Sequence, residues 1–97
     1  MDKIRNRSID NLMKVIAKMS SPDDCYEFFS DLCTIKELQD MGQRFEAAIL
    51  LSEGAKYQEI ASSVKTSSAT ISRVSRCLNY GNGGYEKAIS LFREEEG

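Results

Sequence analysis

Apolar residues recur at intervals of three and four along almost the whole chain, and Pro22 is the only proline. This spacing places side chains on one face of an α-helix, whereas strands alternate every second residue, so the pattern predicts an all-helical protein. With 97 residues the chain has the length of one domain, and we expect a single domain over residues 1–97. A chain of this length buries only about two-thirds of its unfolded surface, so dimerisation would help its small core.

Local signals divide the chain into six predicted helices. Ser21 followed by Pro22 is a typical helix start, and Thr34 with Glu37 has the spacing of a capping box. The predicted helices cover residues 8–19, residues from 22 through 33, a long segment from 34 to 53, and residues 56–64, 69–80 and 85–94. Apolar residues on both sides of the first helix indicate contact with more than one neighbour.

The charges of the chain are unevenly distributed. The net charge of −2 argues by itself against nucleic-acid binding, because proteins that neutralise phosphates usually have a basic excess. Residues 56–80, however, carry Lys56, Lys65, Arg73 and Arg76 against Glu59 alone. Residues 1–19 are also basic, whereas the acidic residues gather in residues 20–53 and at the C-terminal end. Positive charge is therefore concentrated in two segments.

The basic segment at about residues 56–80 fits a helix-turn-helix. Such a motif needs apolar residues where its two helices cross and a small residue where they touch, and five residues meet these demands: Ile60, Ala61, Val64, Ile71 and Val74. Lys65 stands where the usual template prefers glycine, and Thr66 is more polar than usual. The alternative interpretation is an ordinary helical hairpin packed in a core.

The outer side of the second helix of this motif, residues 68–80, favours DNA binding. Short side chains on its first turn allow the backbone to approach base edges in a major groove, and two arginines follow at helical spacing. We predict contacts with double-stranded DNA by Tyr57, Gln58, Ser67, Ser68, Ala69, Thr70, Ser72, Arg73 and Arg76.

Other classes of function find little support in the sequence. The chain has no histidine, no glycine-rich phosphate loop and no nucleophile with a nearby base, so we expect no enzymatic activity. Its three cysteines lack CxxC spacing, so we expect no metal site and interpret them as reduced thiols, mostly in the core. There is no membrane-length apolar run and no signal-peptide pattern, which predicts a cytoplasmic protein without a membrane partner.

Two runs of residues resemble a known family. Met41-Gly42-Gln43-Arg44 and the run from Ala69 to Gly81, ATISRVSRCLNYG, are similar to the tryptophan repressor-like superfamily, and more closely to its YerC/YecD-type branch. The resemblance extends from Thr34 to Phe92. It implies a six-helix fold with a helix-turn-helix, an entwined homodimer, and a sequence-specific transcriptional regulator, a repressor, that reads the major groove with helix 68–80.

The resemblance also implies where a corepressor would bind. Arg44 and Arg73 match the two arginines that sandwich the indole of tryptophan, and Thr34 and Thr70 match threonines close to it. Val74 replaces a glycine beside the pocket, and Cys77 replaces a serine that holds the ligand's polar end. Because a β-branched side chain takes up pocket volume, we expect no cofactor and no tryptophan binding. Whether another small-molecule effector exists stays open.

A function of another class also fits the sequence. The chain would then be a helical protein-interaction module that kept the repressor fold but does not bind DNA. The acidic total charge and the absence of lysine from residues 68–80 favour this alternative. Binding to random-sequence DNA at low salt would distinguish the two functions.

Overall fold

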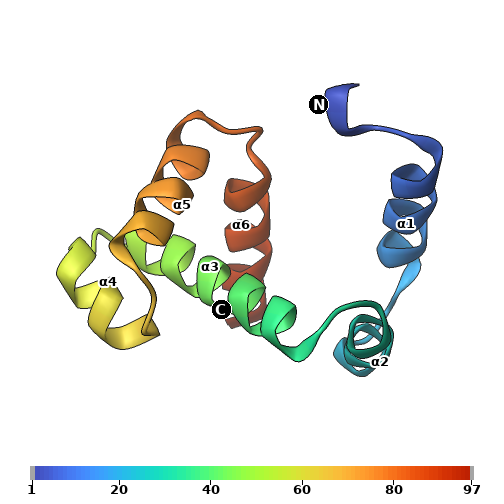
Figure 1. The fold of residues 1–97 in the computed structure, drawn as a ribbon, viewed down its shortest axis with the longest axis horizontal. Coiled ribbons are helices and arrows are strands. Elements are labelled where there is room, and N and C mark those ends of the chain that lie inside the picture. Colours follow the sequence, from blue (N-terminus) through green and yellow to red (C-terminus); the bar gives the residue numbers. More distant parts are fainter. Residues whose placement is uncertain (1, 97) are drawn as a thin grey trace. The chain divides into compact units, whose positions relative to one another are not determined.

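The computed structural model describes residues 2–96, and these residues form helices without any strand (Figure 1). A short 3-10 helix, η1 (Asp2–Ile4), comes first. The α-helices are α1 (Arg7–Lys18), α2 (Pro22–Leu32), α3 (Ile35–Ser52), α4 (Tyr57–Val64), α5 (Ser68–Tyr80) and α6 (Gly84–Glu96). The all-helical prediction is confirmed, and most boundaries agree within one residue. The largest difference is α6, which continues two residues beyond its predicted end.

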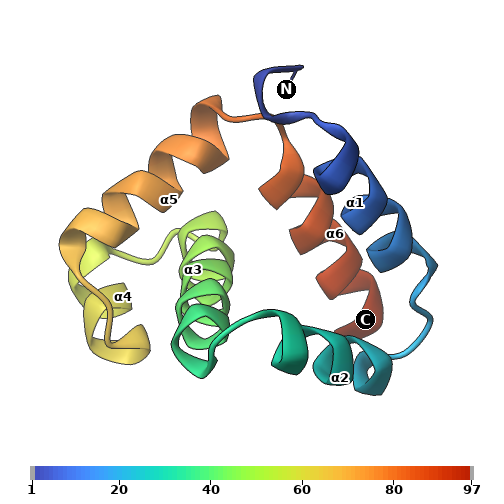
Figure 2. The same ribbon diagram turned by 45° about the vertical axis from the view of Figure 1, so that its right-hand side comes forward.

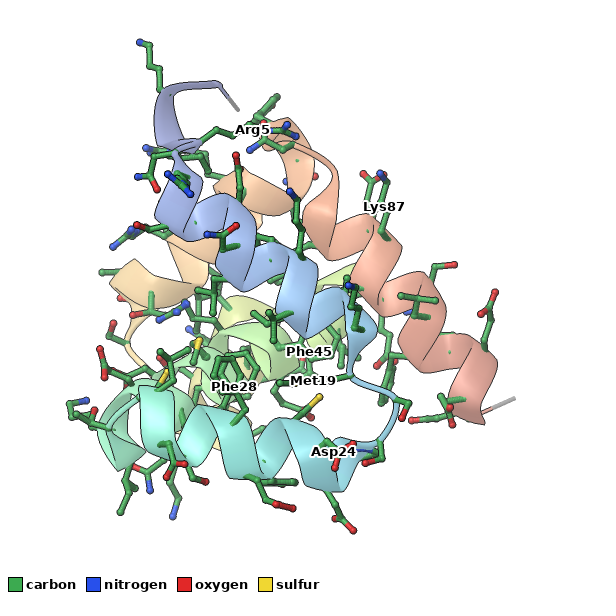
Figure 3. All side chains as sticks on the ribbon, turned by 90° about the vertical axis from the view of Figure 1, so that its right-hand side faces the viewer. Arg5, Met19, Asp24, Phe28, Phe45 and Lys87 are labelled. Carbon is green, nitrogen blue, oxygen red and sulfur yellow. The ribbon has the colours of Figure 1, made fainter. Side chains whose placement is uncertain are left out.

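Side-chain caps explain where several helices begin. The Asn6 side chain accepts a hydrogen bond from the Ile9 backbone N–H at 2.9 Å and starts α1. Ser21 caps α2 by accepting from the Asp24 N–H at 3.1 Å, as predicted, and Figure 3 marks Asp24 at this helix start. Such caps satisfy backbone donors that have no partner inside the helix.

The predicted capping box of α3 is also present. The Thr34 N–H donates to Glu37 Oε1 at 2.7 Å, and the Glu37 N–H donates to Thr34 Oγ1 at 3.0 Å. Hydrogen bonding of the Glu37 carboxyl to the Thr34 backbone N–H, and second to the Thr34 side chain, holds its pKa below the ordinary value. The ionised carboxylate is the better acceptor, so the box stabilises it.

The chain divides into two compact units, one up to Leu38 and one from Gln39 onward. In the first unit, α1 and α2 contain no buried residue. Met13 of α1 is 54% exposed, and Ile35 at the start of α3 is 76% exposed. Phe28, labelled on α2 in Figure 3, meets Phe29 edge to face with the ring centroids 5.7 Å apart, and both side chains are half-buried. Residues 3–38 of the first unit therefore have apolar faces but no buried core.

The second unit holds the hydrophobic core. Its buried residues come from α3, α4, α5 and α6: Ala47, Ala48, Ile49, Ile60, Ile71, Val74 and Ile89. Helix α5 packs against α4 on one side and α6 on the other, and Figure 2 shows α5 and α6 joined by the loop around Gly83. Phe45 of α3 and Phe92 of α6 meet edge to face, 6.2 Å between centroids. This core fixes the position of α5.

One prediction about burial is wrong. The cysteines do not lie in the core: Cys77 is exposed, and Cys25 and Cys33 are half-buried. Cys77 lies about 100° around α5 from the inward-facing Leu78, which turns it away from the core.

Candidate nucleic-acid interface

Helices α4 and α5 form the predicted helix-turn-helix. Ile60 and Ile71 are fully buried and Val74 is 2% exposed, whereas Ala61 and Val64 are half-buried against the core. All five predicted apolar positions therefore pack inward, and they set the crossing of the two helices. Two residues predicted to contact DNA, Tyr57 and Gln58, are exposed at the start of α4.

The turn between the two helices contains an unusual residue. Lys65 ends α4 in the left-handed region, with φ 57° and ψ 47°, and its N–H donates to the Ala61 carbonyl at 3.1 Å. A residue with a Cβ is strained there by roughly 1–2 kcal/mol, whereas glycine is not. The turn therefore has the backbone conformation for which the template prefers glycine, although a lysine adopts it.

Ser67 starts α5. Its Oγ accepts from the Thr70 N–H at 3.1 Å, and its hydroxyl donates to Thr70 Oγ1 at 3.0 Å. Ser67 is therefore the N-cap residue of α5. Thr70, which forms hydrogen bonds with this cap, is half-buried. Ser68 and Ala69 are exposed on the first turn.

The outer side of α5 lies opposite the core. Successive helical residues advance by about 100°, so Ala69, Ser72, Arg73 and Arg76 lie away from the side that Ile71 and Val74 bury, and all four are exposed. Within residues 2–96 neither arginine forms an ion pair with a carboxylate. We call this set of four residues the α5 outer face. It presents small side chains followed by two unneutralised guanidinium groups.

Tyr80 belongs to the same side of α5 but was missed by the sequence prediction. It is 86% exposed and lies four residues, about one helical turn, after Arg76. Tyr80 follows Arg73 and Arg76 at helical spacing, so the sequence alone could have placed it on their side of the helix. Recognition helices read bases with their N-terminal residues, whereas Tyr80 is the last residue of α5.

The residues implied for a corepressor pocket have different environments. The Val74 side chain belongs to the hydrophobic core. Arg44, Arg73 and Cys77 are exposed, and the Thr34 hydroxyl oxygen already accepts the Glu37 N–H. Their joint role in binding a ligand stays a prediction.

Residues 2–96 contain no cluster of three or more histidine, cysteine or acidic side chains placed to hold a metal ion. No described helix is long and apolar enough to cross a membrane.

The fold and the exposed α5 define a small all-helical protein of the helix-turn-helix class. Residues 7–92 match the family model described as Trp repressor protein. The chain is 47% identical over 96 residues to the uncharacterized protein YerC of Bacillus subtilis (strain 168), covering 99% of this chain and 92% of that relative. The chain belongs to the Trp repressor family, as its sequence motifs indicated. This is a family of regulators rather than of enzymes.

Solved structures agree with this assignment. A candidate Trp repressor from Staphylococcus aureus superposes with a TM-score of 0.90 at 36% identity, over 95% of this chain and 92% of that one. A TrpR-like protein from Eubacterium eligens ATCC 27750 gives a TM-score of 0.89 at 40% identity, over 95% of each chain. The tryptophan repressor-like fold is thus confirmed.

Proposed function

We propose that this protein is a sequence-specific DNA-binding transcriptional regulator, a repressor, that reads the major groove with α5. The observation that carries the proposal is the α5 outer face, where Ala69 and Ser72 leave room for base edges beside Arg73 and Arg76. The buried core beneath this helix includes Ile71 and Val74 and packs α5 against α4 and α6. Family membership supports the same function. Because the partner is DNA, we place the protein in the cytoplasm.

We further propose that it acts as a homodimer. The support is the first unit, whose helices α1 and α2 bury no residue although both have apolar faces. A second copy would cover these faces. Sedimentation should give a mass near twice 10.9 kDa, and a monomer at micromolar concentration would remove the basis for two half-sites. In a dimer, the half-site centres should lie roughly 34–36 Å apart, one turn of B-DNA.

The DNA proposal is tested by selecting binding sites from a random DNA pool, followed by gel-shift titration with the selected and a scrambled duplex. We expect a recovered site with two related halves and tighter binding to the selected duplex. The variant Arg73→Ala/Arg76→Ala should lose binding, whereas Lys87→Ala, which removes a positive charge from the exposed side of α6 (Figure 3), should keep it.

Absence of binding to any duplex at low salt would instead favour the protein-interaction module. The net charge of −2 is the observation that keeps this second function in consideration. We propose no tryptophan corepressor, because the resemblance implies that Val74 replaces a glycine beside the pocket, and this larger side chain is buried.

A further inference from the structure

Lys65 is the only non-glycine residue with positive φ among residues 2–96. The two described glycines with positive φ, Gly54 and Gly83, adopt such a backbone without steric cost. At Lys65 the Cβ makes the same conformation unfavourable. Glycine would therefore be the more stable residue in this turn.

Interactions inside the chain do not account for a lysine here. The Lys65 side chain is exposed, and within residues 2–96 it has no hydrogen bond or ion pair. Its charge lies at the C-terminal end of α4, where the helix dipole favours a cation. It also lies three residues before α5, whose N-terminal end disfavours one. The two helix ends thus act in opposite directions on the ammonium group.

We propose that Lys65 binds a DNA backbone phosphate beside the groove that α5 enters. This inference rests on the proposed DNA-binding function and adds a contact that the helical positions alone did not suggest. The first turn of α5 approaches the bases in such a motif, so the residues just before it pass the edge of the groove, where the phosphates lie. A long, flexible, singly charged side chain suits a phosphate contact, which carries no sequence information.

The test uses four variants of the full-length protein. Lys65→Gly removes both the charge and the backbone strain, and Lys65→Asn removes the charge with a residue that tolerates the left-handed region. Lys65→Arg keeps the charge. Lys87→Ala is the matched control, because it removes one positive charge from α6, away from the turn. Each variant is measured by thermal melting at one protein concentration and by DNA titration over a series of salt concentrations.

Lys65→Gly should raise the melting temperature of the dimer by roughly 2–4 °C and at the same time weaken DNA binding. Two phosphate contacts per dimer correspond to a salt slope of about 1.8, so the slope should flatten by that amount. The affinity should fall by one to two orders of magnitude near 0.1 M salt, equally for selected and scrambled duplexes. Lys65→Asn should show the same loss, and Lys65→Arg and Lys87→Ala should bind like the wild type.

Wild-type affinity and slope in both Lys65→Gly and Lys65→Asn would overturn the inference while leaving the proposed function intact. An equal loss in Lys87→Ala would also overturn it, because net charge would then explain the effect. A lower melting temperature in Lys65→Gly would contradict the premise that the lysine strains the turn. Failure of the wild-type protein to bind any DNA would instead refute the proposed function.

Discussion

Both units of the chain have helices with apolar faces, yet among the described residues only those from Gln39 onward include a fully buried side chain. In that unit, residues far apart in sequence, such as Ile49, Ile60 and Ile89, meet in one core. In the unit up to Leu38, α1 and α2 leave Met13, Val15 and Tyr26 largely exposed. An apolar stripe predicts that a helix will be covered, but it does not say which molecule covers it. For the first unit we propose that a second copy of the chain covers these apolar faces.

The largest effect should follow a charge placed on the apolar side of α1. Ile16 is half-buried in the single chain, and the proposed dimer would cover it. Ile16→Asp should prevent dimerisation and, because the first unit has no core of its own, unfold α1 and α2. Sedimentation and circular dichroism would measure both effects, with Asn11→Asp as a control that adds the same charge at an exposed position. A stable dimer of Ile16→Asp would show that α1 contributes little to the interface.

In the second unit, loss of a core side chain should act on stability directly. Ile71→Ala removes a fully buried side chain of α5 and should cost about 2–5 kcal/mol of unfolding free energy. Tyr80→Ala, on the exposed side of the same helix, should change stability by no more than about 0.5 kcal/mol. Denaturant unfolding at a fixed protein concentration measures both. Equal costs would mean that α5 is not held by this core.

Removing one arginine from the α5 outer face should change binding without changing the fold. If Arg76 makes one phosphate contact per subunit, Arg76→Ala removes two contacts per dimer and should flatten the salt slope by about 2. Its melting temperature should stay close to that of the wild type, because Arg76 is exposed and has no carboxylate partner in the described chain. Titrations at several salt concentrations test this. An unchanged slope would mean that this face does not meet DNA.

The capping box of α3 should make a small, pH-dependent contribution. The Glu37 pKa is lowered in the folded protein from its ordinary value of 4.5, so the stabilisation is complete above that pH. It should be lost as the pH falls through the lowered pKa, because the protonated carboxyl binds the Thr34 N–H less well. The melting temperature of the wild type should therefore exceed that of Glu37→Gln at neutral pH, and the difference should shrink in acid. A constant difference would exclude titration of this group as the cause.

No effect at all is expected from tryptophan. A ligand at 100 times its dissociation constant adds about 2.7 kcal/mol to stability, which a melting experiment detects readily. Tryptophan at millimolar concentration should change neither the melting temperature nor the DNA affinity, since Val74 fills space in the core. The variant Val74→Gly should be less stable than the wild type. It tests whether removing the valine side chain allows the protein to bind an indole. A clear shift with the wild type would contradict this expectation.

Local signals determined much of the structure. The starts at Ser21 and Thr34, the break after Tyr80 and the apolar faces of α3, α4 and α5 could all be predicted from the sequence. They depend on hydrogen bonds and spacings within a few residues, which act wherever the segment lies in the fold. The exposed arginines of α5 followed from the same periodicity.

Other features were decided only by the tertiary structure. The exposure of Cys77 depends on which neighbours reach that side of α5, and composition contains no such information. The strained backbone of Lys65 depends on how α4 and α5 must cross to bury Ile60 and Ile71 together. That crossing is a property of several helices at once. Periodicity along one helix indicates which side chains face inward, whereas the packing of the others decides how deeply each is buried.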